Sequence, residues 1–328
     1  MTETVDLLKI EEMKVHFPIK SGVFNNKINY VKAVDGISFT VKKGESFGIV
    51  GESGCGKSTA SRAVLQLIRP TSGKIYFKNA ELTSLPKKQL RNLRKNIQMV
   101  FQDPYDSLNP RLTVAEILDE PLKAHKIGSK EERRNKIIEI MDVCGLNREY
   151  IHRYAHEFSG GQRQRIGIAR ALILKPELVV ADEPVSALDV SIQSQILNLM
   201  MDLQETLNLT YLFISHDLSV VRHFCDRVGV MYLGRMAELA ETNSLFENPL
   251  HPYTKSLLSA IPISNPREKR ERISLQGDVP SPVDPPIGCA FSSRCPEVMD
   301  ICRTSRPAMK EARPDHYVAC HLYTEKRG

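Results

Sequence analysis

The segment GESGCGKS, residues 51–58, carries residue types that suit the binding of a phosphate. It fits the pattern G-x-x-x-x-G-K-[ST] and lies between the apolar run SFGIV and the helix-like run TASRAVLQLI. Glycines let successive amide N–H groups curl around a phosphate, and the start of a helix adds the positive end of its dipole. We expect Lys57 to reach the β- and γ-phosphates of ATP, and the Ser58 hydroxyl to bind Mg²⁺. The expected ATP contacts are Gly51, Ser53, Gly54, Cys55, Gly56, Lys57, Ser58 and Thr59.

Two adjacent acids follow a second apolar run, in the segment ELVVADE. The pattern at residues 51–58 is that of a P-loop. A Mg²⁺ ion held by a P-loop needs a carboxylate from a neighbouring strand end, and Asp182 is placed to supply it. Glu183 beside it costs stability unless a cation or a reaction uses the second charge. We therefore expect Glu183 to polarise the attacking water as a general base.

A second glycine run stands about a hundred residues after the P-loop, in the segment FSGGQRQR. Ser159, Gly160, Gly161 and Gln162 offer a hydroxyl, amide groups and a helix start, which suit the open side of a γ-phosphate. The segment is far along the chain from Lys57. The economical interpretation is that it serves the nucleotide bound to another molecule.

The order of these motifs resembles that of the nucleotide-binding subunits of ABC transporters, from about residue 5 to residue 240. The chain also has FQDP with Gln102, SALD with Asp189 and ISHD with His216. In that family two subunits pack head to tail, and each ATP lies between the P-loop of one subunit and the SGGQ segment of the other. The resemblance implies that Gln102 senses the metal and the γ-phosphate, that Asp189 lines the dimer seam, and that His216 hydrogen-bonds the γ-phosphate.

The family resemblance also implies an aromatic residue that stacks on adenine ahead of the P-loop. Here the insertion PIKSGVFNNKIN separates Phe17 from Tyr30, and either residue could serve. We prefer Phe17. An ordinary strand aromatic is the alternative for each of them.

The elements that position these residues can be expected from the hydrophobic pattern. Alternating residues near the start indicate antiparallel strands, and apolar runs at 46–50 and 96–101 indicate buried strands. Residues 106–160 read as a helical insertion, in which Ile137, Ile138, Met141 and Cys144 share one helix face that ends at Gly145. Strands and helices then alternate, which predicts a mostly parallel sheet covered on both faces. The expected fold is α/β: a P-loop NTPase core with an N-terminal antiparallel β subdomain, the helical insertion and a small cysteine-containing C-terminal extension.

The last part of the chain differs in composition. We expect an ATPase domain over residues 1–262 and a linker with a C-terminal extension over 263–328, because the segment GDVPSPVDPPIG is proline-rich and the preceding NPREKRER is a charge run. Most of residues 248–323 resembles the C-terminal extension of oligopeptide and dipeptide permease ATPases. This resemblance is the only sequence evidence for the substrate class, and nickel or another solute is the alternative.

Four of the seven cysteines crowd into this extension with the spacing C-x5-C-x6-C-x17-C. Structural zinc usually has a tight cysteine pair, which is missing, whereas four thiolates on longer loops suit a [4Fe–4S] cluster. Related permease ATPases suggest the same cluster. Zinc, with His316 or His321 as a further ligand, and the absence of any metal are the alternatives. The expected cluster ligands are Cys289, Cys295, Cys302 and Cys320.

Composition limits the remaining options. The net charge of +6 is too weak and dispersed to indicate a nucleic-acid partner. No apolar run reaches the ~18 residues that span a bilayer, and the start of the chain lacks a signal-peptide pattern, so we expect a peripheral protein on the cytoplasmic face of the membrane. The expected partners are a second ATPase subunit, identical or a sister, two transmembrane permease subunits and, indirectly, an extracytoplasmic peptide-binding protein.

Rival functions share some of these motifs. Soluble ABC ATPases of chromosome repair carry very long coiled coils, and those of translation carry two ATPase halves in one chain; the sequence has neither feature. A non-catalytic nucleotide-binding partner is disfavoured, since Lys57, Asp182, Glu183 and His216 are all present.

Overall fold

The computed structural model describes residues 6–21, 27–261, 273, 275 and 277–323. The chain divides into two compact units, each built from several segments. The helical unit comprises Met1–Leu7, Lys42–Glu45 and Ser84–Ile214, and the phosphate-loop unit comprises Leu8–Val41, Ser46–Thr83 and Ser215–Gly328. The charge run NPREKRER lies outside the described residues. Among the described residues, no helix combines the length and the apolarity that a bilayer crossing requires.

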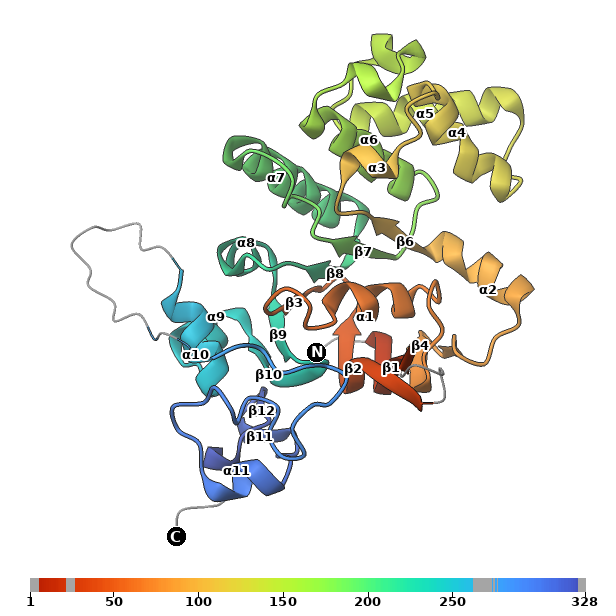
Figure 1. The fold of residues 1–328 in the computed structure, drawn as a ribbon. Helices are drawn as coiled ribbons and strands as arrows, with labels where there is room; N and C mark the ends of the chain where they lie inside the picture. Colours follow the sequence, from red (N-terminus) through yellow and green to blue (C-terminus); the bar gives the residue numbers. More distant parts are fainter. Residues whose placement is uncertain (1–5, 22–26, 262–272, 274, 276, 324–328) are drawn as a thin grey trace, which may run out of the picture. The chain divides into compact units, whose positions relative to one another are not determined.

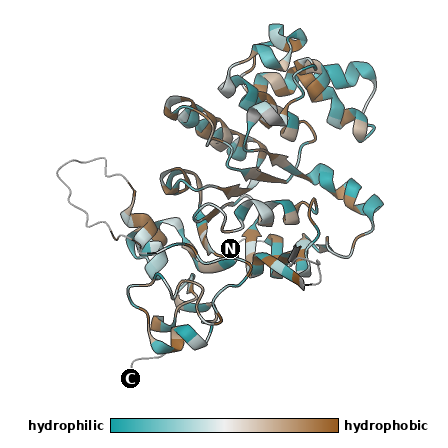
Figure 2. Cartoon of the chain, in the orientation of Figure 1, coloured by the Kyte–Doolittle hydropathy of each residue, from teal (hydrophilic) through white to brown (hydrophobic). Residues whose placement is uncertain are grey.

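The helical unit has three parallel strands at its centre. Strand β7 (Leu178–Asp182) lies between β6 (Ile97–Val100) and β8 (Thr210–Ile214), with Leu178 opposite both Ile97 and Thr210. Every residue of β7 and β8 is buried, and Figure 2 shows these strands as hydrophobic while α2 (Lys87–Leu93) is hydrophilic. Continuous apolar runs of this kind are typical of parallel strands covered on both faces, so the expected buried strands are confirmed.

Helices gather at one end of this unit (Figure 1). Three of them begin at a capping box, in which the side chain of the first residue accepts from a backbone N–H three residues on and a Glu or Gln side chain returns the bond. In α5 the buried residues are Ile137, Ile140 and Met141, so Ile140 takes the place expected for Ile138, which is half-buried. The unit's helices are α2, α3 (Pro104–Ser107), α4 (Val114–Ala124), α5 (Lys130–Val143), α6 (Gly160–Leu172), α7 (Val190–Leu207) and the 3-10 helices Arg94–Asn96, Arg148–His152 and Ala155–Glu157.

The phosphate-loop unit contains two sets of strands. One has the order β2-β1-β4-β5, formed by β1 (Asp6–Ser21), β2 (Lys27–Lys42), β4 (Ser72–Phe77) and β5 (Ala80–Glu81), with β4 antiparallel to β1 and to β5. The other has the order β11-β12-β10-β9-β3, in which β3 (Ser46–Val50) is parallel to β9 (Arg227–Tyr232) and the remaining pairs are antiparallel. The expected N-terminal antiparallel strands are therefore present.

The C-terminal extension adds strands to this second set, which the sequence did not predict. Strand β12 (His316–Val318) pairs with β10 (Arg235–Glu241), and β11 (Lys310–Arg313) pairs with β12. These strands are short, and a run of three or four residues has too little alternation to be recognised. The helices of the unit are α1 (Lys57–Val64), α8 (Leu218–Phe224), α9 (Thr242–Glu247), α10 (Pro252–Ser259), α11 (Asp300–Thr304) and the 3-10 helix His321–Tyr323.

A buried polar network joins the extension to β10. The Glu238 carboxylate is fully buried, where it accepts the backbone N–H groups of Leu250 (2.7 Å) and His251 (2.9 Å) and bonds the ring of His316 (2.6 Å). The other ring nitrogen of His316 bonds Ser244. A buried carboxylate is stable only when its oxygens are bonded in this way. Both nitrogens of His316 are thus used structurally, which removes it from the alternative zinc ligands.

Candidate functional site

The P-loop follows β3 and ends where α1 begins. Its glycines are required by close approach of other backbone: a Cβ on Gly51 would lie 2.1 Å from the Met231 carbonyl oxygen, and one on Gly56 would lie 2.0 Å from that of Ala33. Gly56 also has φ of 103°, a conformation that side chains disfavour. The loop is therefore built for its backbone to pack closely on both sides.

The P-loop lysine lies inside the loop that it serves. Lys57 is only 4% exposed, and its ammonium group donates to the carbonyl oxygens of Gly51 (2.8 Å) and Glu52 (3.0 Å). Cys55 is buried in the same loop, and burial raises the pKa of its thiol. The neutral thiol therefore does not cancel the positive charge of Lys57, and that charge suits an anionic ligand.

Other expected residues of the phosphate-loop unit are exposed. His216 lies just after β8 and directly before Asp217, whose carboxylate caps α8 by accepting from the backbone of Ser219 at 2.8 Å. Phe17 on β1 is 37% exposed and Tyr30 on β2 is 47% exposed. Both aromatic side chains are accessible, so exposure does not separate the two candidates for stacking on a base.

The acidic pair stands at the end of β7 in the helical unit. Asp182 is 2% exposed, whereas Glu183 is half-buried and has φ of 49°. A left-handed conformation is uncommon for a residue with a side chain and costs free energy, so it persists where surrounding structure imposes it. Here the Glu183 N–H donates to the Ile214 carbonyl at 2.9 Å, and its own carbonyl accepts the Ser186 hydroxyl at 3.1 Å. Nothing in the residue types around Glu183 predicts this left-handed backbone.

Gln102 is brought to the acidic pair. Its amide nitrogen donates to Glu183 Oε2 at 3.0 Å, although the two residues are 81 positions apart. The bond places the Gln102 amide beside the carboxylate that we expect to act as a base. It also leaves the amide oxygen of Gln102 free to face a cation, since the nitrogen is the group that points to Glu183.

The second glycine run forms the start of α6. Ser159 caps the helix, with its hydroxyl accepting from the Gln162 N–H at 3.4 Å while the Gln162 side chain accepts the Ser159 N–H at 3.1 Å. A Cβ on Gly161 would lie 2.5 Å from Ile192 Cγ2, and one on Gly160 would lie 3.2 Å from Leu188. The glycines thus let α6 approach the start of α7, whose N-cap is the exposed Asp189. Ser159–Gln162 and Asp189 thus stand at the starts of two helices of the same unit, α6 and α7.

The extension gathers its four cysteines. Cys302 and Cys320 are buried and Cys289 and Cys295 half-buried, and the Cys289 N–H donates to the Cys302 carbonyl at 2.8 Å. Burial, followed by the other thiols of the set, raises the pKa of Cys295 to about 11 and that of Cys320 to about 12. Within the described residues, no three His, Cys, Asp or Glu side chains converge closely enough to grip a single metal ion. The four sulfurs are neighbours without forming a one-ion site.

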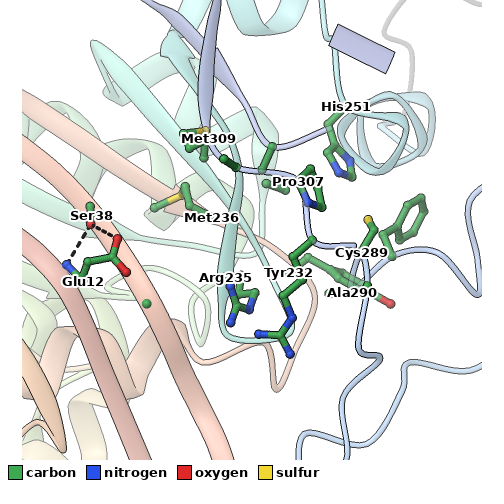
Figure 3. A pocket seen from close by; sticks show the side chains of 17 residues that line it. Glu12, Ser38, Tyr232, Arg235, Met236, His251, Cys289, Ala290, Pro307 and Met309 are labelled. Carbon is green, nitrogen blue, oxygen red and sulfur yellow. Dashed lines mark hydrogen bonds between the residues drawn. The ribbon is translucent and has the colours of Figure 1, made fainter. Parts of the chain in front are cut away.

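A cavity of about 430 Å³ separates the extension from strands of the same unit (Figure 3). Its charged groups already bind one another or nearby groups. The Ser38 hydroxyl donates to Glu12 at 3.0 Å, and the guanidinium groups of Arg235 and Arg306 lie 2.6 Å and 3.4 Å from Asp35. Burial raises the pKa of Asp35, but the bonds from Arg235 and His16 outweigh it and hold that pKa below its ordinary value. The ion pair between Arg306 of the extension and Asp35 of β2 therefore connects the two walls of the cavity.

Comparisons with known proteins give the families that two parts of the chain match. The sequence model of the family described as ABC transporter matches residues 34–186, and that of the oligopeptide/dipeptide transporter C-terminal region matches residues 237–302. The oligopeptide transport ATP-binding protein AppF of Bacillus subtilis (strain 168) is 59% identical over 97% of this chain and 98% of its own length. The putative oligopeptide transport ATP-binding protein YkfD of the same organism is 52% identical over 97% and 95%.

Solved structures of similar fold cover about three quarters of the chain. The dimeric ATP-binding cassette MJ0796, in a post-hydrolysis state bound to ADP and phosphate, is 32% identical with a TM-score of 0.63 and covers 72% of this chain and 98% of its own. CbiO1 of Clostridium perfringens, part of the transporter complex cbiONQ, is 28% identical with a TM-score of 0.64 and covers 74% of this chain and 92% of its own.

Proposed function

The chain belongs to the oligopeptide ABC transporter ATP-binding proteins, and from that premise we propose that each ATP it hydrolyses is held jointly by two subunits. The protein is the ATPase subunit of a peptide importer, and it works as an ATPase dimer with membrane permease subunits. The expected fold class, a P-loop NTPase of the ABC type, is confirmed. The proposal concerns which residues carry the reaction and how the two subunits divide them.

In the proposed site the P-loop of one subunit binds the phosphates and the start of α6 in the other subunit covers them. The observation that carries this proposal is the self-capped N-terminus at Ser159, which is exposed beside Asp189. Backbone N–H groups and the helix dipole at such an end favour a negative ligand. Because Ser159 and Gln162 already bond each other, the end is formed before any ligand arrives.

The residues in the helical unit are proposed to carry out the hydrolysis. Glu183 accepts a proton from the attacking water, and Gln102 holds the Glu183 carboxylate through the bond from its amide nitrogen. Asp182 lies next to this base at the strand end. His216 is proposed to hydrogen-bond the γ-phosphate, and Phe17, with Tyr30 as the alternative, to stack on adenine.

Mg²⁺ fits the oxygen donors that these motifs offer. The Ser58 hydroxyl, the Gln102 amide oxygen and the Asp182 carboxylate are hard oxygen ligands of the kind that Mg²⁺ prefers. The orientation of Gln102, with its nitrogen toward Glu183, agrees with an oxygen directed to a cation. When bound, the ion would neutralise charge on the β- and γ-phosphates.

The proposed membrane assembly contains two permease subunits, with a second ATPase subunit that is identical or a sister, at the cytoplasmic face of the membrane. An extracytoplasmic peptide-binding protein delivers the substrate to the permeases. Purification of the tagged chain from detergent-solubilised membranes tests this assembly. Copurification with proteins of several membrane spans supports it, whereas copurification with ribosomes or DNA in their place contradicts it.

We further propose that the cysteine set of the extension holds a [4Fe–4S] cluster. The extension carries four cysteines, which is the number of thiolate ligands that a [4Fe–4S] cluster takes. A cluster would fix the extension, which is too short to build a large core of its own. Anaerobic purification is the test: a brown protein absorbing near ~400 nm supports the cluster. A colourless, iron-free protein with stoichiometric zinc would contradict it.

A further inference from the structure

Arg294 of the extension binds the P-loop directly. It stands next to Cys295, and its guanidinium donates two bonds to the Glu52 carboxylate, from Nη1 to Oε2 at 2.8 Å and from Nη2 to Oε1 at 3.1 Å. Glu52 is the second residue of the segment GESGCGKS. Paired bonds of this kind fix both position and orientation, which a single contact would not do. The extension thus contacts the P-loop at Glu52.

The backbone of Glu52 is held as well as its side chain. Its N–H donates to the Tyr253 hydroxyl on α10 at 2.9 Å, and its carbonyl oxygen accepts the Lys57 ammonium at 3.0 Å. Tyr253 packs against Tyr232, with ring centroids 4.7 Å apart, and the Arg294 guanidinium lies over the Tyr232 ring at 5.9 Å. The rings of Tyr232 and Tyr253 therefore support both groups that hold Glu52. The carbonyl oxygen of Glu52 is in turn an acceptor for Lys57.

Arg294 is an expensive residue to bury. Its side chain is only 8% exposed, and its Nε has no hydrogen-bond acceptor among the described residues. An unsatisfied buried donor costs free energy, and an apolar side chain of similar volume often stabilises a fold as well as a buried ion pair does. Arg294 is therefore poorly explained as a stabiliser of the extension alone. The Glu52 carboxylate that it binds is 27% exposed and belongs to a loop suited to anions.

We propose that Arg294 is a positioning residue for ATP binding, which acts through Glu52 on the P-loop. It has two effects: it holds the loop backbone in the form that receives the phosphates, and it neutralises a carboxylate that would otherwise repel them. The inference rests on the proposed function in that the P-loop must be the phosphate site. The cysteine-bearing extension then contributes to nucleotide affinity in addition to its own fold.

A double-mutant cycle tests the inference on the full chain, with the dissociation constant for MgATP measured by calorimetry. Arg294→Met should weaken binding about tenfold, because the Glu52 charge is left unpaired beside the phosphates. Glu52→Gln alone should stay within about threefold of wild type, because it removes the negative charge that would repel the phosphates while the positive charge of Arg294 remains. The double variant should bind better than Arg294→Met, and KM should rise more than kcat falls. Arg303→Met, an exposed arginine of α11, is the matched control and should bind normally.

Two results would overturn the inference: unchanged affinity in Arg294→Met, whether or not its melting temperature falls, or additive effects of the two substitutions. If Arg294→Met does not fold, Arg294→Lys keeps the charge with fewer donors and should weaken binding about threefold, and wild-type affinity in that variant would count against the inference. Lys57→Ala is measured alongside. Weak binding in Lys57→Ala with normal binding in Arg294→Met overturns this inference only, whereas normal binding in Lys57→Ala overturns the proposed phosphate site as well.

Discussion

Two glycine-containing helix starts differ in how they are held. The P-loop before α1 is embedded: carbonyl groups of Ala33 and Met231 press on its glycines, and Tyr253 and Arg294 hold Glu52 from far along the chain. The start of α6 is held by its own residues, Ser159 and Gln162, and is open to solvent. A loop that binds its ligand within one chain is supported by that chain, whereas a self-capped end that faces outward suits a ligand presented by another molecule.

The largest expected effect comes from substitution of the proposed general base, Glu183. Glu183→Gln should bind MgATP with near-normal affinity but turn it over at least about 100-fold more slowly, because the amide keeps the bond to Gln102 yet accepts no proton from water. ATP should then hold the closed dimer together, which analytical ultracentrifugation would detect. Glu205→Gln, an exposed acid of α7, is the matched control. Normal turnover in Glu183→Gln would remove Glu183 from the reaction.

The next effect concerns the embedded loop. Lys57→Ala should lose MgATP affinity on the order of 100-fold, because the charge-assisted bonds to the phosphates are lost. Equilibrium dialysis with radiolabelled nucleotide measures this loss, with Lys87→Ala, an exposed lysine of α2, as the control. Lys57→Ala and Glu183→Gln thus separate two roles, since the first variant should lose nucleotide binding and the second should lose turnover.

A smaller effect separates the cap at Ser159 from its proposed contact with phosphate. Asp and Asn both cap helices well, so Ser159→Asp and Ser159→Asn should keep α6 intact. Only the aspartate adds a negative charge next to the γ-phosphate, and it should lower the steady-state ATPase rate about tenfold relative to the asparagine variant. Equal ATPase rates in the two variants would contradict the proposed contact, because the start of α6 would then not face a phosphate.

The last effect is on the stability of the fold and leaves both glycine-containing helix starts unsubstituted. His251 is fully buried, where its ring accepts the Tyr253 N–H, and burial lowers its pKa to about 4. Because the unfolded chain takes up a proton that the folded chain resists, the free energy of unfolding should fall as pH drops from 6.5 to 4, by roughly 3 kcal/mol at most. Urea unfolding at several pH values measures this change. His251→Asn keeps a capping acceptor without the titration and should flatten the dependence.

The fold and the motif residues were largely predictable because they depend on local sequence. The P-loop, the acidic pair and SGGQ each occupy a contiguous segment, and buried parallel strands leave long apolar runs around them. Ser159 and Gln162 even bond across three positions, so sequence spacing and structure agree there.

What could not be predicted depends on residues that are distant in the sequence. Arg294 and Glu52 are 242 positions apart, and His316 and Glu238 are 78 apart. No spacing rule connects such partners, so the sequence does not single out Arg294, and it leaves His316 open as an alternative zinc ligand. The positive φ of Glu183 was also invisible, because the surrounding strands impose it and the residue type does not favour it.

Mixing two defective variants tests the shared site most directly. Lys57→Ala loses the lysine that binds the phosphates, and Ser159→Asp places a negative charge where the start of α6 should cover the γ-phosphate. Each variant alone should therefore hydrolyse ATP at only about a tenth of the wild-type rate or less. In a mixture, half of the pairs should combine one of each and own one complete site of two, which predicts recovery of about a quarter of wild-type activity. Undiminished activity of Ser159→Asp alone, with nothing gained on mixing, would contradict a site completed by the second subunit.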